Sequence, residues 1–235
     1  MHDLLITKGT IVDGRGGEPF VGDVAITRGR IVGVGAPGSQ GAEAHEVIDA
    51  TGLLVTPGFV DIHSHYDGQV TWDPYLTPSC FHGVTTVVMG NCGVGFAPVA
   101  PDKRQWLSEL MEGVEDIPGT ALAAGMRWGW ETFPEYLDFI DSTPYVMDVG
   151  TQIAHAPVRA YVMGERGAQN ENATAEDIER MAAIVKEAIA AGALGFSTSR
   201  TMLHHALDGT PVPGTFATEA ELFGIGNALR ELGTG

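Results

Sequence analysis

The chain has 235 residues, of which 44% are apolar and 18% charged, and its formal net charge at pH 7 is −17. This length allows one large domain or two small ones with a sizeable core. The negative charge argues against non-specific binding to nucleic acid or to an anionic membrane. No apolar run approaches the roughly 20 residues that cross a bilayer, and the first residues carry no basic leader. We therefore expect a cytoplasmic protein.

The first 55 residues are predicted to form short strands separated by turns. Dipeptides such as Lys8-Gly9 and Arg28-Gly29 interrupt runs that are rich in β-branched residues. The predicted strands are Leu4–Thr7, Thr10–Val12, Asp23–Thr27, Arg30–Val34, Glu46–Ile48 and Leu53–Val55. Because strands this short are not stable as a lone hairpin, we expect residues 1–55 to form a small β-sandwich.

After Pro57 the pattern changes to an alternation of strands and helices. The first strand of this region runs into His63, and three more are predicted at Gly83–Gly90, Tyr145–Ala154 and Ala193–Ser199. The predicted helices are Phe133–Ile140, one between the cap Thr174 (with Asp177) and Gly192, and one between the cap Thr218 (with Glu221) and Gly233. Repeated units of this kind indicate an α/β fold with parallel strands, either a barrel or an open doubly wound sheet.

The position of the polar residues favours the barrel. Candidate functional side chains follow the predicted strands, and catalytic residues of a TIM-like barrel lie at the C-terminal strand ends. A closed barrel needs eight strand–helix units, whereas residues 56–235 contain four. We therefore expect this region to be a barrel that is incomplete at its C-terminus. The open sheet edges would be covered by the remainder of the barrel or by a second chain.

The segment Thr56–Asp67, TPGFVDIHSHYD, carries two histidines at the end of the first strand. In an extended chain the side chains of His63 and His65 point to the same side. Neutral imidazole is the commonest metal ligand, so the pair is a candidate site for a divalent cation. A hydrogen-bonded pair of structural histidines is the alternative interpretation.

A turn of sequence Gly90-Asn91-Cys92-Gly93 closes the second strand. Its glycines let the backbone bring the Cys92 side chain over the strand ends. Close to a divalent cation this thiol would lose its proton and become a ligand. The alternative is a small buried apolar residue, and we assign that role to Cys80.

Five segments together resemble the N-acyl-D-amino-acid deacylase (D-aminoacylase) branch of the amidohydrolase superfamily: DLLITKGTIVDG, TPGFVDIHSHYDGQ, HGVTTVVMGNCGVGFAP, GTQIAHAPVRAYVMG and GALGFSTS. The resemblance implies a zinc-dependent enzyme with one or two ions that hydrolyses the linear amide of a small N-acyl-D-amino acid. It also implies that His63 and His65 hold the first ion and that Cys92 holds or bridges a second. Two further histidine ligands and an aspartate general base are expected beyond residue 235, so the chain as given is expected to be inactive.

Four residues are candidates for contact with the substrate. Asp67 lies just after the histidine pair, and Arg159 or Arg200 is a candidate partner for the substrate carboxylate. His155 lies at a strand end, although its segment AHAPVR departs from the family's usual GHGTLR. Either arginine is alternatively a loop anchor, and His155 is alternatively a structural residue.

Two other functions remain open. One is hydrolysis of a cyclic amide, as in hydantoinases and dihydropyrimidinases. The other is a non-catalytic fragment that needs the rest of the barrel.

Overall fold

The structure is a computed structural model that describes residues 1–115 and 117–234. The chain forms two compact units, Met1–Gly58 and Phe59–Gly235. The assignment of residues 1–55 to a β-sandwich domain and of 56–235 to a barrel domain stays a prediction.

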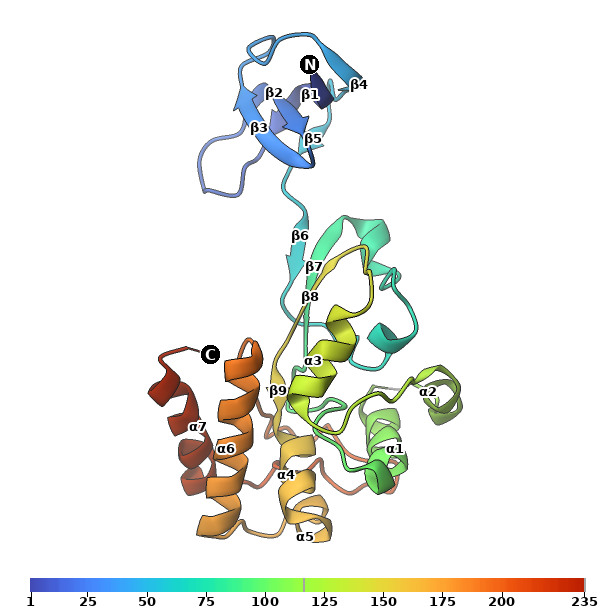
Figure 1. Ribbon diagram of the computed structural model, residues 1–235, viewed down its shortest axis with the longest axis vertical. Coiled ribbons are helices and arrows are strands. Elements are labelled where there is room, and N and C mark those ends of the chain that lie inside the picture. Colours follow the sequence, from blue (N-terminus) through green and yellow to red (C-terminus); the bar gives the residue numbers. More distant parts are fainter. Residues whose placement is uncertain (116, 235) are drawn as a thin grey trace. The chain divides into compact units, whose positions relative to one another are not determined.

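The first unit is built on a mixed sheet (Figure 1). Its strands are β1 (His2–Ile11), β2 (Phe20–Thr27), β3 (Arg30–Gly35), β4 (Ala44–Asp49) and β5 (Leu54–Val55). They lie in the order β3-β2-β1-β4, and β5 pairs with β1. The β1–β2 and β2–β3 pairs are antiparallel, whereas β4 and β5 run parallel to β1. The described strands of this unit make one layer, so a sandwich is not confirmed.

The turn predicted at Lys8-Gly9 is wrong, because β1 continues through it. Lys8 has a φ of 58°, and the register of β1 against β2 shifts between Ile6 and Gly9. The buried carboxylate of Asp23 accepts a 2.8 Å hydrogen bond from the Lys8 amide. The Lys8 amide is thus hydrogen-bonded although Lys8 has no partner in the register of β1 against β2. The register shift is therefore a bulge within the single strand β1.

The second unit has parallel strands followed by helices, which confirms the α/β class. The strands β6 (Phe59–Asp61), β7 (Val84–Met89) and β8 (Asp148–Thr151) form one parallel sheet in that order. A second parallel pair joins β9 (Ile153–Ala154) to β10 (Phe196–Ser197). The predicted third strand is therefore divided at Gln152, and the fourth is shorter than predicted. The number of barrel units stays a proposal.

The helices of this unit confirm several predicted ends. Thr174 and Asp177 form a capping box at the start of α6, Gly192 caps its end, and α7 begins after Thr218 and ends before Gly233. The α-helices are α1 (Arg104–Glu115), α2 (Gly119–Gly125), α3 (Phe133–Asp141), α4 (His155–Met163), α5 (Glu165–Ala168), α6 (Ala175–Ala191) and α7 (Glu219–Leu232). The short 3₁₀ helices are η1 (Gln69–Thr71), η2 (Ser79–His82) and η3 (Pro101–Lys103).

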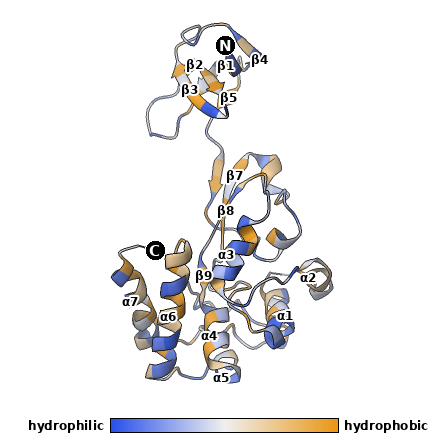
Figure 2. Cartoon of the chain, in the orientation of Figure 1, coloured by the Kyte–Doolittle hydropathy of each residue, from blue (hydrophilic) through white to orange (hydrophobic). Residues whose placement is uncertain are grey.

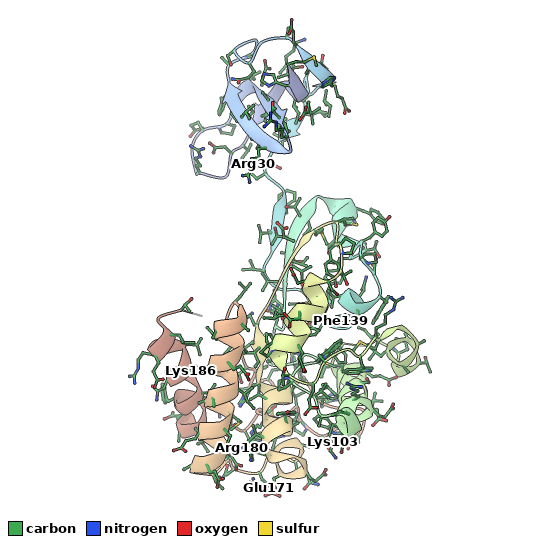
Figure 3. All side chains as sticks on the ribbon, viewed as in Figure 1. Arg30, Lys103, Phe139, Glu171, Arg180 and Lys186 are labelled. Atoms are coloured by element: carbon green, nitrogen blue, oxygen red, sulfur yellow. The ribbon has the colours of Figure 1, made fainter. Side chains whose placement is uncertain are left out.

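Figure 1 shows α6 and α7 side by side. Lys186 of α6, labelled in Figure 3, forms an ion pair of 2.8 Å with Glu231 of α7. None of the helices formed by the described residues has the length and apolar character that crossing a bilayer requires.

Two buried aromatic residues anchor the loops that follow β6 and β7. The Trp130 indole donates a 2.8 Å hydrogen bond to the carbonyl of Phe96, and the Tyr136 hydroxyl donates one of 3.0 Å to the carbonyl of Asp67. Both side chains belong to the main hydrophobic core. The core therefore holds the two loops on which the candidate site is built.

The strand β6 has apolar side chains that are not covered. Phe59 and Val60 are exposed, as is Ile62 just after the strand, and Figure 2 shows the hydrophobic colour along β6. An exposed apolar edge of this kind favours association with another segment or chain.

The cap of α6 gives a test of local stability. Replacing Thr174 with alanine removes the side-chain acceptor of the Asp177 amide, so the second unit should lose about 1 kcal/mol of unfolding free energy. Urea unfolding followed by tryptophan fluorescence measures this loss, because all four tryptophans lie in this unit. The control is Thr120→Ala at an exposed position of α2, which should change stability by less than about 0.5 kcal/mol. Equal losses in both variants would refute the capping role.

Candidate metal centre

The histidine pair lies directly after β6 and is held by backbone contacts to its surroundings. The amide of His63 donates to the Asp61 carboxylate at 3.1 Å. The amide and hydroxyl of Ser64 both donate to the carbonyl of Val88, at 3.0 and 2.9 Å. The ring centroids of His63 and His65 lie 5.4 Å apart, so both imidazoles face one small region.

Cys92 lies at the tip of the turn that follows β7, with its backbone in the left-handed region. Its φ is 55°, and the flanking glycines Gly90 and Gly93 have φ values of 74° and 73°. A Cβ atom on Gly90 would lie 2.1 Å from the carbonyl oxygen of Gln152. Glycine is therefore required at position 90 both for its φ and for the close approach of the Gln152 backbone.

The turn and the histidine pair meet at one point. His63 Nε2 lies 3.2 Å from Cys92 Sγ. One ligand atom from each of His63, His65 and Cys92 falls within 4.8 Å of the others. The three residues named from the sequence as metal ligands are thus brought together in the structure, while their coordination of an ion stays a prediction.

This donor set suits one class of metal ion. Two imidazole nitrogens and a thiolate are preferred by zinc and by other borderline or soft divalent ions, whereas calcium and magnesium prefer oxygen. The spacing of the donor atoms also leaves room for a single ion between them. The residues present therefore fit a zinc ion.

The candidate substrate residues lie in different environments. Asp67 is buried, its carbonyl accepts from Tyr136, and its Oδ1 lies close to Gly95. Burial of Tyr136, with the nearby charge of Asp67, raises the pKa of that phenol well above its usual value. Arg200 is exposed in the segment after β10. Contact of either residue with a substrate stays a prediction.

His155 and Arg159 belong to a buried ionic cluster centred on Glu221 of α7. Glu221 Oε1 accepts from His155 Nε2 at 2.9 Å and from Arg159 Nε at 2.8 Å, and all three side chains are at most 1% exposed. His155 Nδ1 lies 2.9 Å from the Thr198 hydroxyl.

The guanidinium of Arg159 has further partners, the carbonyls of Gly167 and Glu171. The polar atoms of His155 and Arg159 are therefore committed to holding α4, α5 and α7 together. Sequence reasoning identified Glu221 only as a helix-capping residue, because nothing in its neighbourhood signals a partner 66 positions away. Contact of His155 and Arg159 with a substrate stays a prediction.

A cavity of about 360 Å³ lies between the start of α1 and the helices α4 and α5. Trp106, Pro157 and Tyr161 line it, and Lys103, labelled in Figure 3, is one of its charged residues. Within the part of the chain that the structure describes, the residues that line this cavity do not include His63, His65 or Cys92. The cavity is therefore distinct from the metal group.

The chain belongs to the amidohydrolase family, whose family model matches residues 46–234. It is similar to the D-aminoacylase of Alcaligenes xylosoxydans xylosoxydans, with 35% identity over 196 residues that cover 83% of this chain and 37% of the relative. Among solved structures, a crystal structure of D-aminoacylase matches all of this chain and 44% of its own, with 29% identity and a TM-score of 0.79. The N-acyl-D-glutamate deacylase of Bordetella bronchiseptica, complexed with zinc and a phosphonate inhibitor, matches with 30% identity and a TM-score of 0.72. That match covers 99% of this chain and 44% of the deacylase.

The chain therefore spans about two fifths of the length of these relatives. The cyclic-amide alternative has weaker support. An L-hydantoinase structure from Arthrobacter aurescens matches with 16% identity and a TM-score of 0.50, a likeness that shows the fold alone.

The Glu221 cluster predicts a specific pH dependence of stability. Burial works to raise the pKa of Glu221, but hydrogen bonds from His155 and Arg159 and the charge of Arg159 outweigh it and lower the pKa. A carboxylate with a lowered folded pKa stabilises the protein above the unfolded value of about 4.3, and this contribution is lost as the pH falls through the folded pKa. Glu221→Gln should therefore cost about 3 kcal/mol at pH 7, because Arg159 stays buried without its counter-charge.

The same variant should lose less stability than the native protein when the pH is lowered from 6 toward the acid limit of folding. Urea unfolding at several pH values in this range measures both effects. The control is Glu231→Gln, whose carboxylate pairs with Lys186 on the exposed surface. Parallel stability curves for Glu221→Gln and the native protein would rule out the assigned role of the carboxylate.

Proposed function

We propose that this protein is a zinc-dependent amidohydrolase that removes the acyl group from N-acyl-D-amino acids, with zinc held by His63, His65 and Cys92. The observation that carries the proposal is the meeting of these three donor atoms within 4.8 Å. The likeness of the chain to D-aminoacylase supports the choice of reaction. The chain spans about two fifths of that relative's length, and the activity of the relative is therefore only a proposal for this protein.

The zinc ion and the side chains of the protein would have separate roles. When bound, zinc supplies Lewis acidity, which polarises a carbonyl group and lowers the pKa of water toward about 7. The chain's own residues orient the ligands: Ser64 holds the histidine segment against β7 through its two bonds to Val88. Arg200, an exposed cation in an acidic protein, is the proposed partner of the substrate carboxylate.

The substrate and partner proposals follow from the same features. A small anionic substrate needs a local positive charge, which the zinc ion and Arg200 would provide. The exposed apolar residues of β6 support the proposal that a further segment or a second chain covers this edge. A two-ion centre would need ligands in addition to the three that meet here.

The two cysteines provide a matched test of the metal centre. Replacing Cys92 with serine removes the thiolate, so Co²⁺ added to the variant should give no sulfur-to-metal charge-transfer absorption, and Zn²⁺ affinity should fall at least about tenfold. Cys80→Ser, at the other half-buried cysteine, should leave both signals unchanged. Loss of the absorption in both variants or in neither would contradict the assignment of Cys92 as a ligand.

A substrate panel separates deacylation from cyclic-amide hydrolysis. We expect the zinc-loaded full-length protein, which is the form to assay because the 235-residue chain is expected to be inactive, to release free amino acid from N-acetyl-D-amino acids in preference to the L enantiomers, and a chelator should abolish this. Amino-acid release is measured by a ninhydrin assay, and ring opening of hydantoins by loss of ultraviolet absorption. Turnover of hydantoins with the N-acetyl-D-amino acids untouched would favour the cyclic-amide alternative.

A further inference from the structure

The histidine pair and the Cys92 turn are joined by a side chain that takes no part in the proposed chemistry. Asn91 immediately precedes Cys92 and is 6% exposed. Its Nδ2 donates to the carbonyl of Ser64 at 3.1 Å and to that of Val88 at 2.9 Å. Ser64 stands between His63 and His65, so this amide bridges the segments that carry the three metal-binding candidates.

The orientation of the Asn91 amide is set by its other end. Its Oδ1 accepts a 2.8 Å hydrogen bond from Nε2 of Gln152, in the break between β8 and β9. The donor end must then face the two carbonyls. The carbonyl of Val88 also accepts from the amide and hydroxyl of Ser64. One carbonyl of β7 is therefore hydrogen-bonded both to the histidine segment and to the Cys92 turn.

The turn itself needs such support. Cys92 has a positive φ without being glycine, and a conformation of this kind persists only where the surroundings determine it. Ser197 braces the far side of the turn, since its hydroxyl accepts from the Gly93 amide at 3.0 Å and donates to the Gly90 carbonyl. Asn91 supplies the matching restraint on the side of the histidines.

We propose that Asn91 is a positioning residue of the metal centre, whose amide sets the separation between the two imidazoles and the Cys92 thiolate. The inference rests on the proposed metal site and adds to it a residue that is not one of the three proposed ligands. Side chains that hold metal ligands in place typically change metal affinity 10–100-fold when they are replaced.

The test is Asn91→Asp in the 235-residue chain. Aspartate has the same shape and still accepts from Gln152, but it places a carboxylate oxygen against the carbonyls of Ser64 and Val88. We expect Co²⁺ and Zn²⁺ to bind at least about tenfold more weakly and the thiolate charge-transfer band of Co²⁺ to weaken or shift. Thermal unfolding of the metal-free chain, recorded in parallel, reports structural damage separately.

Asn170→Asp is the matched control. Asn170 makes an equivalent pair of bonds elsewhere, from Nδ2 to the Pro211 carbonyl at 2.8 Å and from the Gly214 amide to Oδ1 at 2.9 Å. The same exchange there should leave Co²⁺ affinity and the charge-transfer band unchanged. A fall in the unfolding temperature of Asn91→Asp with unaltered metal affinity would overturn the positioning role and leave a purely structural one.

If Asn91→Asp does not fold, the variant Gln152→Met tests the positioning role of Asn91. This variant removes only the bond that orients the Asn91 amide, and we expect a smaller but measurable loss of Co²⁺ affinity. Affinity equal to that of the native chain would overturn the proposal. A native chain that binds Co²⁺ without any thiolate band would instead overturn the proposed metal centre itself, so the two failures are distinguishable.

Discussion

The contact between His63 Nε2 and Cys92 Sγ, 3.2 Å long, is the constraint on which the rest of the candidate site depends. The two residues are 29 positions apart, and they meet because β6 and β7 are parallel neighbours whose carboxyl ends share one edge. The pairing of Asp61 with Val87 sets where each chain leaves the sheet. A slip of this register would turn the side chains to the other face and separate the donors.

The surroundings of this edge supply rigidity from two sides. The core aromatic residues Trp130 and Tyr136 pin the loops after β7 and β6 through bonds to backbone carbonyls. On the other side, the cluster of Glu221, His155 and Arg159 ties α4 to α7 and holds Thr198, whose backbone packs against Gly93. A metal site benefits from such support because its ligands must keep their separation before the ion arrives.

Two arginines of this acidic protein lie in opposite environments. Arg159 is buried and neutralised by Glu221, so its charge serves the fold. Arg200 is exposed. With only 13 lysines and arginines against 30 acidic residues, the chain has few positive charges to offer an anionic ligand, which increases the importance of a bound cation.

Local patterns in the sequence were sufficient to predict several features of the fold and of the candidate site. The starts of α6 and α7 could be predicted because each capping threonine accepts from the amide three residues further on, so the interaction is visible in the sequence. The candidate metal residues could be named because alternation along a strand places His63 and His65 on one side. The strand–helix alternation itself indicated the α/β class.

Only the tertiary structure decided the rest, because it depends on residues far apart in the chain. Asp23 pairs the Lys8 amide and lets β1 continue where a turn was predicted. The side-chain amide of Asn91 contacts Ser64, 27 residues away in the sequence, and Glu221 contacts His155, 66 residues away. No periodicity in the sequence predicts these contacts. The sequence alone determined which residues had metal-binding chemistry and which local elements would form. Folding alone determined that they meet, since only the parallel pairing of distant strands brings their donor atoms to one point.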